Sequence, residues 1–349
     1  MRVSVELPDR SYEVVLADGA RHQLAALLKA RAPRARVVAL VTSASLRAEP
    51  WFDFETGLIE HVLEMPDGEG AKSLGVLERL CECLAELEMS RHDVIVGVGG
   101  GAITDLAGFA AAVYLRGIDL VQVPTSLVGQ VDAAIGGKTA VNLRAGKNLV
   151  GAFHQPLGVL CDFETLATLP ERERLAGLGE VAKCWLLERR RASELAGVGL
   201  HELVEMSVRL KAVVVANDEF EGGLRARLNY GHTLAHALEA VAIARDVDEM
   251  RHGEAVAIGL AFAVRLAHRL GRVDADEIAN HDAVLAVLGL SRRLPAHFVT
   301  SELIAAMGHD KKAHHDLTFV LAGADGFDVV AGVDATVVAD VLEKFRGEP

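Results

Sequence analysis

The sequence predicts an α/β fold in which a parallel sheet covered by helices is followed by a mainly α-helical part. Two observations support this prediction. Short aliphatic and β-branched runs recur early in the chain, each followed by a turn and a helix-length segment, as is typical of parallel sheets. After Cys161 these runs fade and long helical patterns take over. We therefore expect an α/β domain at residues 1–165 and a mainly helical domain at residues 166–349.

The strands of the first domain follow from the chain in order. Residues 2–16 alternate in polarity around the turn dipeptide at residues 8–9, which predicts a hairpin added antiparallel at the sheet edge. Apolar runs at residues 37–41, 94–98 and 120–123 predict buried parallel strands. Phosphate groups usually bind where such strands end, so the residues that follow them are candidates for a ligand site.

A helix start marks the boundary between the domains. Thr168 is a candidate N-cap, Pro170 suits the first turn, and Glu171 stands at the capping-box spacing. We expect a helix to begin there. Within the second domain, the residues at 189–191 and 197–199 predict an exposed loop.

The composition excludes several classes of protein. Lysine and arginine number 36 against 49 aspartates and glutamates, so the net charge of −13 disfavours general binding to nucleic acids or anionic membranes. We find neither a signal peptide nor a bilayer-spanning segment. The four cysteines fit buried thiols in a reducing compartment better than disulfides. We therefore expect a cytoplasmic protein with no nucleic-acid and no membrane partner.

A glycine-rich turn follows the predicted strand at residues 94–98. Gly99, Gly100 and Gly101 end the strand, and Asp105 lies at the entry to an apolar helix. Backbone N–H groups of such a turn can approach a pyrophosphate without interference from side chains. Because the spacing is not G-x-G-x-x-G, a phosphate site and an ordinary tight turn both remain open at this point.

Possible metal ligands lie in the second half of the chain. His232 and His236 share one helix face, His252 opens another helical run, and Glu180 precedes Lys183 on a third helix. A carboxylate and two imidazoles with an open fourth position suit a catalytic divalent cation. Each residue could instead be an ordinary polar group on a solvated helix face. Their position beside apolar helices favours the metal site.

Cationic residues are numerous around the glycine-containing motifs for so acidic a protein. Together they could surround a polyanion, although each alone could be a surface charge. They are Lys138, Lys147, Lys211, Arg225, Lys311 and Lys312.

Taken in order, these segments resemble the sugar phosphate cyclases, and most closely the 3-dehydroquinate synthase family. The shared motifs of the first half are PDGE (66–69), KSL (72–74), GGG (99–101), DLAGF (105–109), YLRG (114–117), QVPTSL (122–127), VD (131–132), GGKTAVN (136–142) and GKN (146–148). Those of the second half are GEVAK (179–183), LNYGHT (228–233), HGEAV (252–256) and DKK (310–312). The resemblance spans almost the whole chain.

The resemblance implies a fold and a reaction. The fold is a Rossmann-like parallel-sheet domain followed by the helical domain of the dehydroquinate synthases. The reaction converts the seven-carbon sugar-acid phosphate DAHP into 3-dehydroquinate and phosphate. It proceeds by hydride removal to NAD, phosphate elimination, hydride return, ring opening and aldol closure. The implied cofactors are NAD and Zn²⁺, with Co²⁺ or another divalent ion possible, and the implied assembly is a homodimer.

The resemblance also assigns roles by position. The zinc ligands correspond to Glu180, His232 and His252. The NAD positions correspond to Asp67, Gly68, Glu69, Lys72, Gly100, Gly101, Asp105, Thr125, Ser126, Lys138, Lys147, Thr165 and Thr168. The substrate and catalytic positions correspond to Asp132, Lys138, Asn148, Lys183, Lys211, Arg225, Asn229, His236 and Lys312, which we prefer to Lys311. His236, one helical turn from His232, is expected to relay a proton.

Three other interpretations remain open. An aminodehydroquinate synthase would act on an amino analogue of DAHP that keeps the carboxylate, for which the guanidinium of Arg225 is suited. An iron-type alcohol or glycerol dehydrogenase would share the two-domain architecture but stop at hydride transfer. A protein without enzymatic activity would only bind a nucleotide or a partner. The set of lysines and Arg225 argues against the dehydrogenases, and the completeness of the site argues against the last interpretation.

Overall fold

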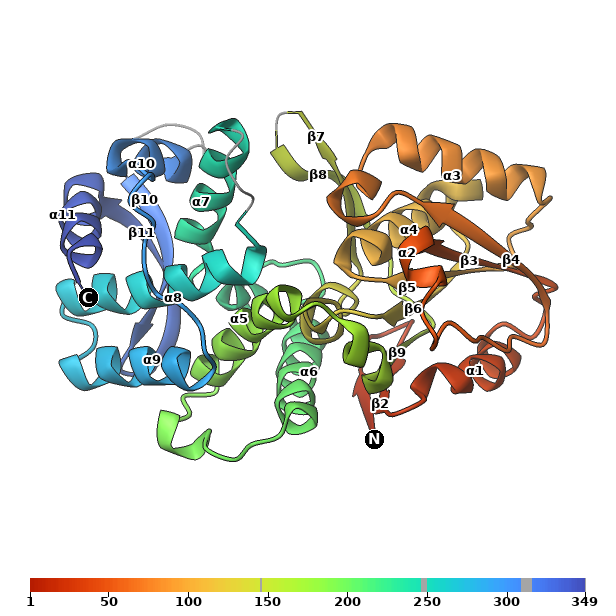
Figure 1. Ribbon diagram of the computed structural model, residues 1–349, viewed down its shortest axis with the longest axis horizontal. Coiled ribbons are helices and arrows are strands. Elements are labelled where there is room, and N and C mark those ends of the chain that lie inside the picture. Colours follow the sequence, from red (N-terminus) through yellow and green to blue (C-terminus); the bar gives the residue numbers. More distant parts are fainter. Residues whose placement is uncertain (145, 246–249, 309–315, 349) are drawn as a thin grey trace. The chain divides into compact units, whose positions relative to one another are not determined.

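The computed structural model describes residues 1–144, 146–245, 250–308 and 316–348, which form two compact units (Figure 1). The first unit comprises Met1–Arg174 and Ser207–Phe220, and the second comprises Leu175–Met206 and Glu221–Pro349. The domain boundary at residues 165/166 stays a prediction. The units themselves, defined by their internal contacts, divide after Arg174, and residues 207–220 belong to the first.

The first unit contains a seven-stranded sheet in the order β1-β2-β9-β6-β5-β3-β4. Its strands are β1 (Arg2–Val5), β2 (Tyr12–Ala17), β3 (Val37–Ser43), β4 (Ile59–Met65), β5 (Val94–Gly99), β6 (Asp119–Pro124) and β9 (Gly158–Asp162). Strand β1 pairs antiparallel with β2, and the other pairs are parallel. The predicted hairpin and the three predicted parallel strands are therefore confirmed, whereas β4 and β9 were not predicted.

Helices cover both faces of this sheet. They are α1 (Leu24–Arg31), α2 (Ala44–Arg47), α3 (Leu74–Glu86) and α4 (Gly101–Val113). In β3, Val37, Ala39 and Val41 enter the core formed with α3 and α4. The alternate residues Val38 and Leu40 enter the core formed with α1. Because successive side chains of a strand point to opposite faces, a strand buried on both sides is mostly apolar, as β3 is from Val37 to Val41.

Short helical turns connect the longer elements in both units. They are η1 (Ala20–Gln23), η2 (Gly68–Ala71), η3 (Tyr114–Arg116), η4 (Gly129–Ala133), η5 (Phe163–Thr168), η6 (Ala192–Glu194) and η7 (Leu224–Asn229). A separate antiparallel hairpin consists of β7 (Lys138–Leu143) and β8 (Gly146–Phe153), and it contains the GGKTAVN motif from Lys138 onward. This hairpin was not predicted.

The second unit is mainly helical, as predicted. Its helices are α5 (Glu171–Leu187), the start of α6 (Leu200–Asn217), α7 (His232–Arg245), α8 (His252–Arg269), α9 (Ala275–Val287), α10 (Thr300–Gly308) and α11 (Ala335–Arg346). Helix α8 is buried along most of its length and contacts α7, α9 and α11. A hairpin of β10 (Asp316–Gly323) and β11 (Gly326–Asp334) also packs against α8 and was not predicted.

The predicted helix start holds, but its predicted cap is wrong. Helix α5 begins at Glu171, whereas Thr168 is the last residue of η5. The hydroxyl of Thr168 accepts a hydrogen bond from the indole N–H of Trp51 at 3.0 Å. Across the described residues, we also find no helix with both the length and the apolar character that a membrane crossing requires.

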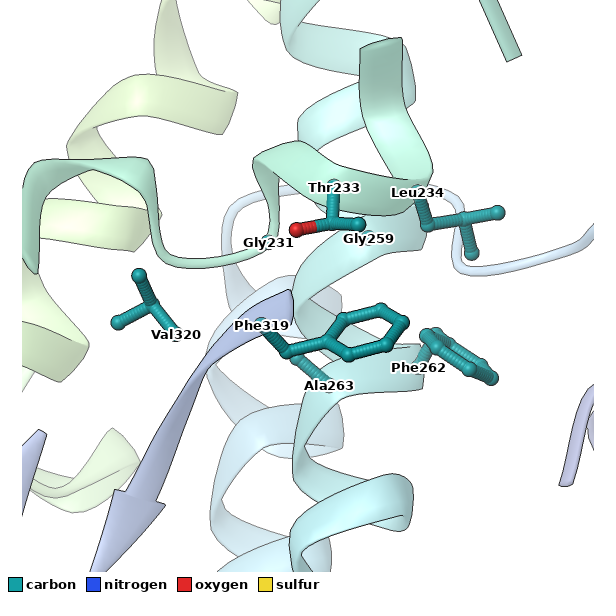
Figure 2. A pocket seen from close by; sticks show the side chains of 8 residues that line it. All are labelled: Gly231, Thr233, Leu234, Gly259, Phe262, Ala263, Phe319 and Val320. Atoms are coloured by element: carbon teal, nitrogen blue, oxygen red, sulfur yellow. The ribbon is translucent and has the colours of Figure 1, made fainter. Parts of the chain in front are cut away.

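Glycines let three helices of the second unit approach at backbone contact distance. A Cβ atom on Gly259 of α8 would lie 2.0 Å from the carbonyl oxygen of Gly231, the residue before α7. Figure 2 shows Gly231 and Gly259 facing each other, with Phe319 beside them. Similarly, a Cβ on Gly253 of α8 would lie 1.6 Å from the carbonyl oxygen of Ala176 in α5. Larger side chains at these points would force the helices apart.

We predict that Gly259→Ala lowers the free energy of unfolding by at least about 1–3 kcal/mol, because the new methyl group overpacks this contact. The control is Gly75→Ala in α3, where a Cβ meets no atom within 4 Å. That change should be neutral or stabilise by up to about 1 kcal/mol. Denaturant unfolding of the two variants checks this, and equal stabilities would contradict the packing argument.

Candidate metal centre and active site

Glu180, His232 and His252 come together in the second unit. Glu180 lies in α5, while His232 and His252 are the first residues of α7 and α8. Glu180 Oε1 lies 3.0 Å from His252 Nε2 and 3.5 Å from His232 Nε2. One ligand atom from each residue lies within 4.8 Å of the other two. The sequence prediction that these residues converge is therefore met by the geometry, and the binding of a cation by them stays a prediction.

The outer nitrogen of each imidazole has its own partner. His232 Nδ1 lies 3.1 Å from the carbonyl oxygen of Tyr230, and His252 Nδ1 lies 3.2 Å from Glu239 Oε2. Because a carbonyl and a carboxylate both accept hydrogen bonds, each Nδ1 carries the hydrogen. Each Nε2 therefore faces Glu180, and in the neutral ring its lone pair is available for a cation.

Tyr230 is itself held in place. Its hydroxyl lies 2.8 Å from His281 Nε2, and His281 Nδ1 lies 2.8 Å from the carbonyl oxygen of Glu277. Burial of His281 lowers its pKa to about 4, so the ring is neutral and accepts the hydrogen bond from the tyrosine hydroxyl. This fixes the backbone next to Gly231 and His232.

Positive and negative groups of the centre compensate one another. Burial opposes ionisation of Glu180, but the positive charge of Lys183 and hydrogen bonds from both imidazoles hold the pKa of Glu180 well below its ordinary value. Burial also opposes charge on His252, but hydrogen bonds to Glu180 and Glu239 raise its pKa to about 10. One buried carboxylate oxygen with two imidazole nitrogens is a donor set suited to Zn²⁺ or Co²⁺.

Three further predicted site residues lie in the same unit. His236 is exposed, and its ring centroid lies 5.3 Å from that of His232 and 6.3 Å from that of His252. Arg225 is buried in η7, and Asn229 of the same turn donates to Glu221 Oε1 at 3.2 Å. His236 therefore lies beside both candidate imidazole ligands.

The predicted cofactor residues of the first unit follow the carboxyl ends of the parallel strands. They come after β4 (Asp67, Gly68, Glu69, Lys72), β5 (Gly100, Gly101, Asp105), β6 (Thr125, Ser126) and β9 (Thr165, Thr168). Because carboxyl ends of parallel strands meet at one edge of a sheet, these residues gather there, where nucleotides bind in open α/β folds.

Hydrogen bonds connect several of these residues. Lys72 forms an ion pair with Asp105 and donates to Asn148 Oδ1 at 2.6 Å. Asn142 of β7 donates to Glu69 at 2.6 Å. Burial raises the pKa of Asp105 to about 6, although Lys72 counteracts it. Asn148, predicted to contact the substrate, thus lies among residues predicted to contact the cofactor.

The glycine turn packs closely on the segment that follows β6. The backbone N–H of Thr125 donates to the carbonyl of Gly99 at 3.0 Å. A Cβ on Gly100 would lie 3.3 Å from Ser126 Oγ, and one on Gly101 would lie 3.2 Å from the Cβ of Ala133. The absence of side chains leaves the backbone at the start of α4 close to its neighbours.

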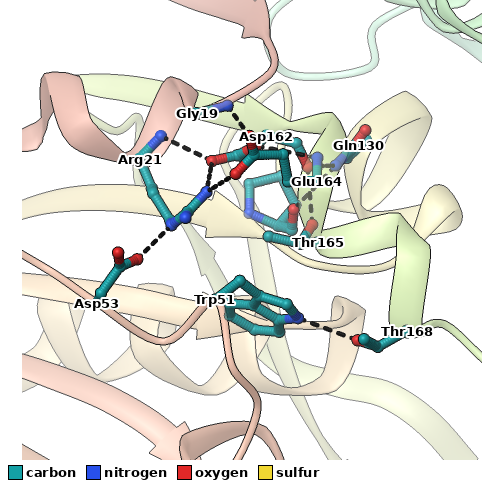
Figure 3. A network of polar contacts seen from close by, with 10 residues as sticks. Gly19, Arg21, Trp51, Asp53, Gln130, Asp162, Glu164, Thr165 and Thr168 are labelled. Carbon is teal, nitrogen blue, oxygen red and sulfur yellow. Dashed lines mark hydrogen bonds and ion pairs between the residues drawn. The ribbon is translucent and has the colours of Figure 1, made fainter.

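A polar network holds the segment after β9. Arg21 donates to Asp162 Oδ2 at 2.7 Å, and the hydroxyl of Thr165 donates to the carbonyl of Asp162 at 2.8 Å. Figure 3 shows this network and the hydrogen bond from Trp51 to Thr168. Arg21 and Asp162 are both buried, so the ion pair fixes the position of η5.

The remaining predicted residues that the structure describes lie in the first unit. Lys211 of the first unit forms an ion pair with Asp132 and donates to the carbonyl of Asp132 at 2.6 Å. Lys138 and Lys147 are exposed on the β7–β8 hairpin. Lys311 and Lys312 lie outside the described residues.

Sequence reasoning missed two acidic residues that contact predicted site residues. Glu239 contacts His252, and Glu221 contacts Asn229. Glu239 had a detectable signal, because it lies seven positions after His232 and therefore on the same face of the helix. Glu221 precedes η7 and has a positive φ of 61°, which no local pattern indicated.

The chain matches two parts of one known family. Residues 62–176 match the family described as 3-dehydroquinate synthase N-terminal, and residues 177–313 match the one described as 3-dehydroquinate synthase C-terminal. A protein of Amycolatopsis mediterranei (strain S699), provisionally named an aminodehydroquinate synthase, is 47% identical over 98% of this chain and 94% of its own length. The 3-dehydroquinate synthase of Mycobacterium leprae (strain TN) is 44% identical over 89% of this chain and 87% of its own.

A solved structure confirms the fold. The 2-epi-5-epi-valiolone synthase of Streptomyces hygroscopicus subsp. jinggangensis 5008, with NAD⁺ and Zn²⁺ bound, has a TM-score of 0.80 and 26% identity, with 99% of each chain covered. The architecture of the two units is thus that of a sugar phosphate cyclase. The chain belongs to the 3-dehydroquinate synthase family and is an enzyme of that family.

We predict that the candidate centre binds a divalent cation more tightly as the pH rises. Below its pKa of about 10, His252 of the metal-free protein carries a proton that the cation must displace. The affinity for Zn²⁺ should therefore rise about tenfold per pH unit near neutrality, with about one proton released per cation. Competition with a chromophoric chelator at several pH values checks this. An affinity independent of pH would contradict the assignment of His252.

Proposed function

We propose that the chain is a 3-dehydroquinate synthase that converts DAHP into 3-dehydroquinate and phosphate. The observation that carries the proposal is the convergence of Glu180, His232 and His252 in a chain that matches this family over both halves. The gathering of the predicted NAD residues after the parallel strands supports it. When bound, NAD accepts and returns a hydride, and the divalent cation polarises the substrate oxygen.

The side chains of the protein account for the remaining requirements. Arg225 suits a substrate carboxylate because its guanidinium can bind two oxygens at once. His236 would move a proton at a substrate oxygen, since it is exposed and lies beside both candidate imidazole ligands. Lys183 stabilises the ionised carboxylate of Glu180. Lys211 and Asp132 would act on the substrate as a pair of fixed charges.

Aminodehydroquinate synthesis is the second candidate. The relative from Amycolatopsis mediterranei, which carries that provisional name, is 47% identical over 98% of this chain. The 3-dehydroquinate synthase of Mycobacterium leprae is almost as similar, at 44% identity over 89% of this chain. An amino analogue of DAHP keeps the phosphate and the carboxylate, so the same cationic residues would serve it. A homodimer in the cytoplasm, with Zn²⁺ or Co²⁺ as the cation, completes the proposal.

We predict that the purified protein releases phosphate from DAHP with NAD in catalytic amounts, because each cycle returns the hydride. Excess EDTA should abolish the release, and Zn²⁺ or Co²⁺ should restore it. A phosphate-release assay with DAHP and with its amino analogue, analysed for the cyclic product, tests both candidates. Preference for the amino analogue would replace the first candidate by the second. Net NADH formation without phosphate release would favour a dehydrogenase and contradict both.

We predict that Arg225→Lys lowers kcat/KM for DAHP at least tenfold, because a point charge replaces a two-pronged donor. The affinity for Zn²⁺ should stay unchanged, since Arg225 is not among the three candidate ligands. Because Arg225 is buried, thermal unfolding of the variant serves as a control for folding. A folded variant with the kcat/KM of the wild type would contradict the assignment of Arg225 to the substrate.

A further inference from the structure

We propose that Glu239 is a positioning residue that orients His252 and sets how tightly the centre holds its cation. The inference rests on the proposed function only in requiring a cation at Glu180, His232 and His252. Glu239 lies in α7 and reaches the first residue of α8, where its Oε2 is 3.2 Å from His252 Nδ1. The opposite nitrogen of the same ring lies 3.0 Å from Glu180. His252 is thus held between two carboxylates.

The two imidazoles differ in how much the fold constrains them. The His232 side chain is 10% exposed and follows Gly231, which is packed against α8. The His252 side chain is 33% exposed, and the residue before it, Arg251, is extended with φ −67° and ψ 144°. Packing therefore fixes His232, whereas His252 needs a directional partner to keep its Nε2 aimed at the cation.

The two partners also differ in charge. His232 donates to a neutral carbonyl group, whereas His252 donates to a carboxylate. A carboxylate behind the ring makes the imidazole a stronger donor to a cation than a carbonyl does, and it fixes the tautomer. The strength with which His252 would donate to the cation thus depends on a side chain, so a single substitution can change it.

The burial of Glu239 fits this role. Its side chain is 8% exposed, and a buried carboxylate is costly unless nearby charges compensate for it. Around His252, the carboxylates of Glu180 and Glu239 oppose the ammonium of Lys183. Once a cation has displaced the proton of His252, one net negative charge remains among these groups, which a divalent cation more than offsets. Neutralising Glu239 would therefore weaken the site for cations without removing a ligand.

The test uses the full-length protein, freed of metal, with Zn²⁺ alone and with Co²⁺ alone. For Glu239→Gln, which keeps an acceptor but loses the charge, we expect the affinity for Zn²⁺ to fall about 10–100-fold. The visible absorption of the Co²⁺-loaded protein should change as well, because the ligand field of His252 changes. Glu254→Gln is the matched control: Glu254 lies two residues after His252 and caps the backbone N–H of Arg251, a role that Gln can keep.

A second variant keeps the test decisive if Glu239→Gln does not fold. Glu239→Asp keeps the charge but moves it away from His252 by the length of one methylene group. This variant should lose part of its affinity for Zn²⁺, and the spectrum of its Co²⁺-loaded form should shift. If the folded variants bind Zn²⁺ like the wild type and leave the spectrum unchanged, the role of Glu239 is overturned and the proposed function stands. If the wild type itself binds neither ion, the metal centre and this inference fall together.

Discussion

The structure of the second unit depends on one buried negative charge, which lies where helices α5, α7 and α8 meet. Glu180 is fully buried in α5, and Lys183 and two imidazoles reach its carboxylate and stabilise it. The helices can come this close because glycine or alanine stands at the contacts, with Gly253 against Ala176 and Gly259 against Gly231. Backbone packing thus brings His232 and His252 to Glu180, and the charges then define what the site can bind.

In the first unit, the topology of the sheet brings the predicted site residues together. Its parallel strands end at one edge of the sheet, so short motifs far apart in the sequence gather there. The polar contacts between them then fix the side chains: Lys72 joins Asp105 to Asn148, and Asn142 reaches Glu69. Topology therefore places these residues, and hydrogen bonds orient them.

The parts of the fold that the sequence predicted are those with a local signal. Strand β3 is buried on both faces and is apolar from Val37 to Val41, the run that the sequence predicted, before it ends in Thr42 and Ser43. Strand β4 carries exposed charged residues at the sheet edge and was missed. The cap predicted for α5 is wrong because Thr168 is the last residue of η5, where its hydroxyl accepts a hydrogen bond from Trp51, far away in the sequence. The pattern of neighbouring residues in the sequence does not reveal such a contact.

The same limit explains the site. Glu180, His232 and His252 were recognisable because metal-binding residue types next to apolar helices require a reason. Glu239 lies on the same helix face as His232, which was its signal in the sequence, but its contact with His252 depends on the packing of α8 beside α7 and so follows from the tertiary structure. Residues that bind directly leave a chemical signature in the sequence, whereas residues that position them often do not.

Substrate choice within the family follows the same logic. DAHP and its amino analogue share a phosphate and a carboxylate, so Arg225 and the lysines that suit these groups cannot distinguish the two. Discrimination requires a group that responds to one amino substituent, through a single hydrogen bond or a single charge. A difference at that one residue leaves the rest of the sequence almost unchanged. This explains why sequence identities of 47% over 98% of the chain and 44% over 89%, to proteins with the two names, identify the family more sharply than the substrate.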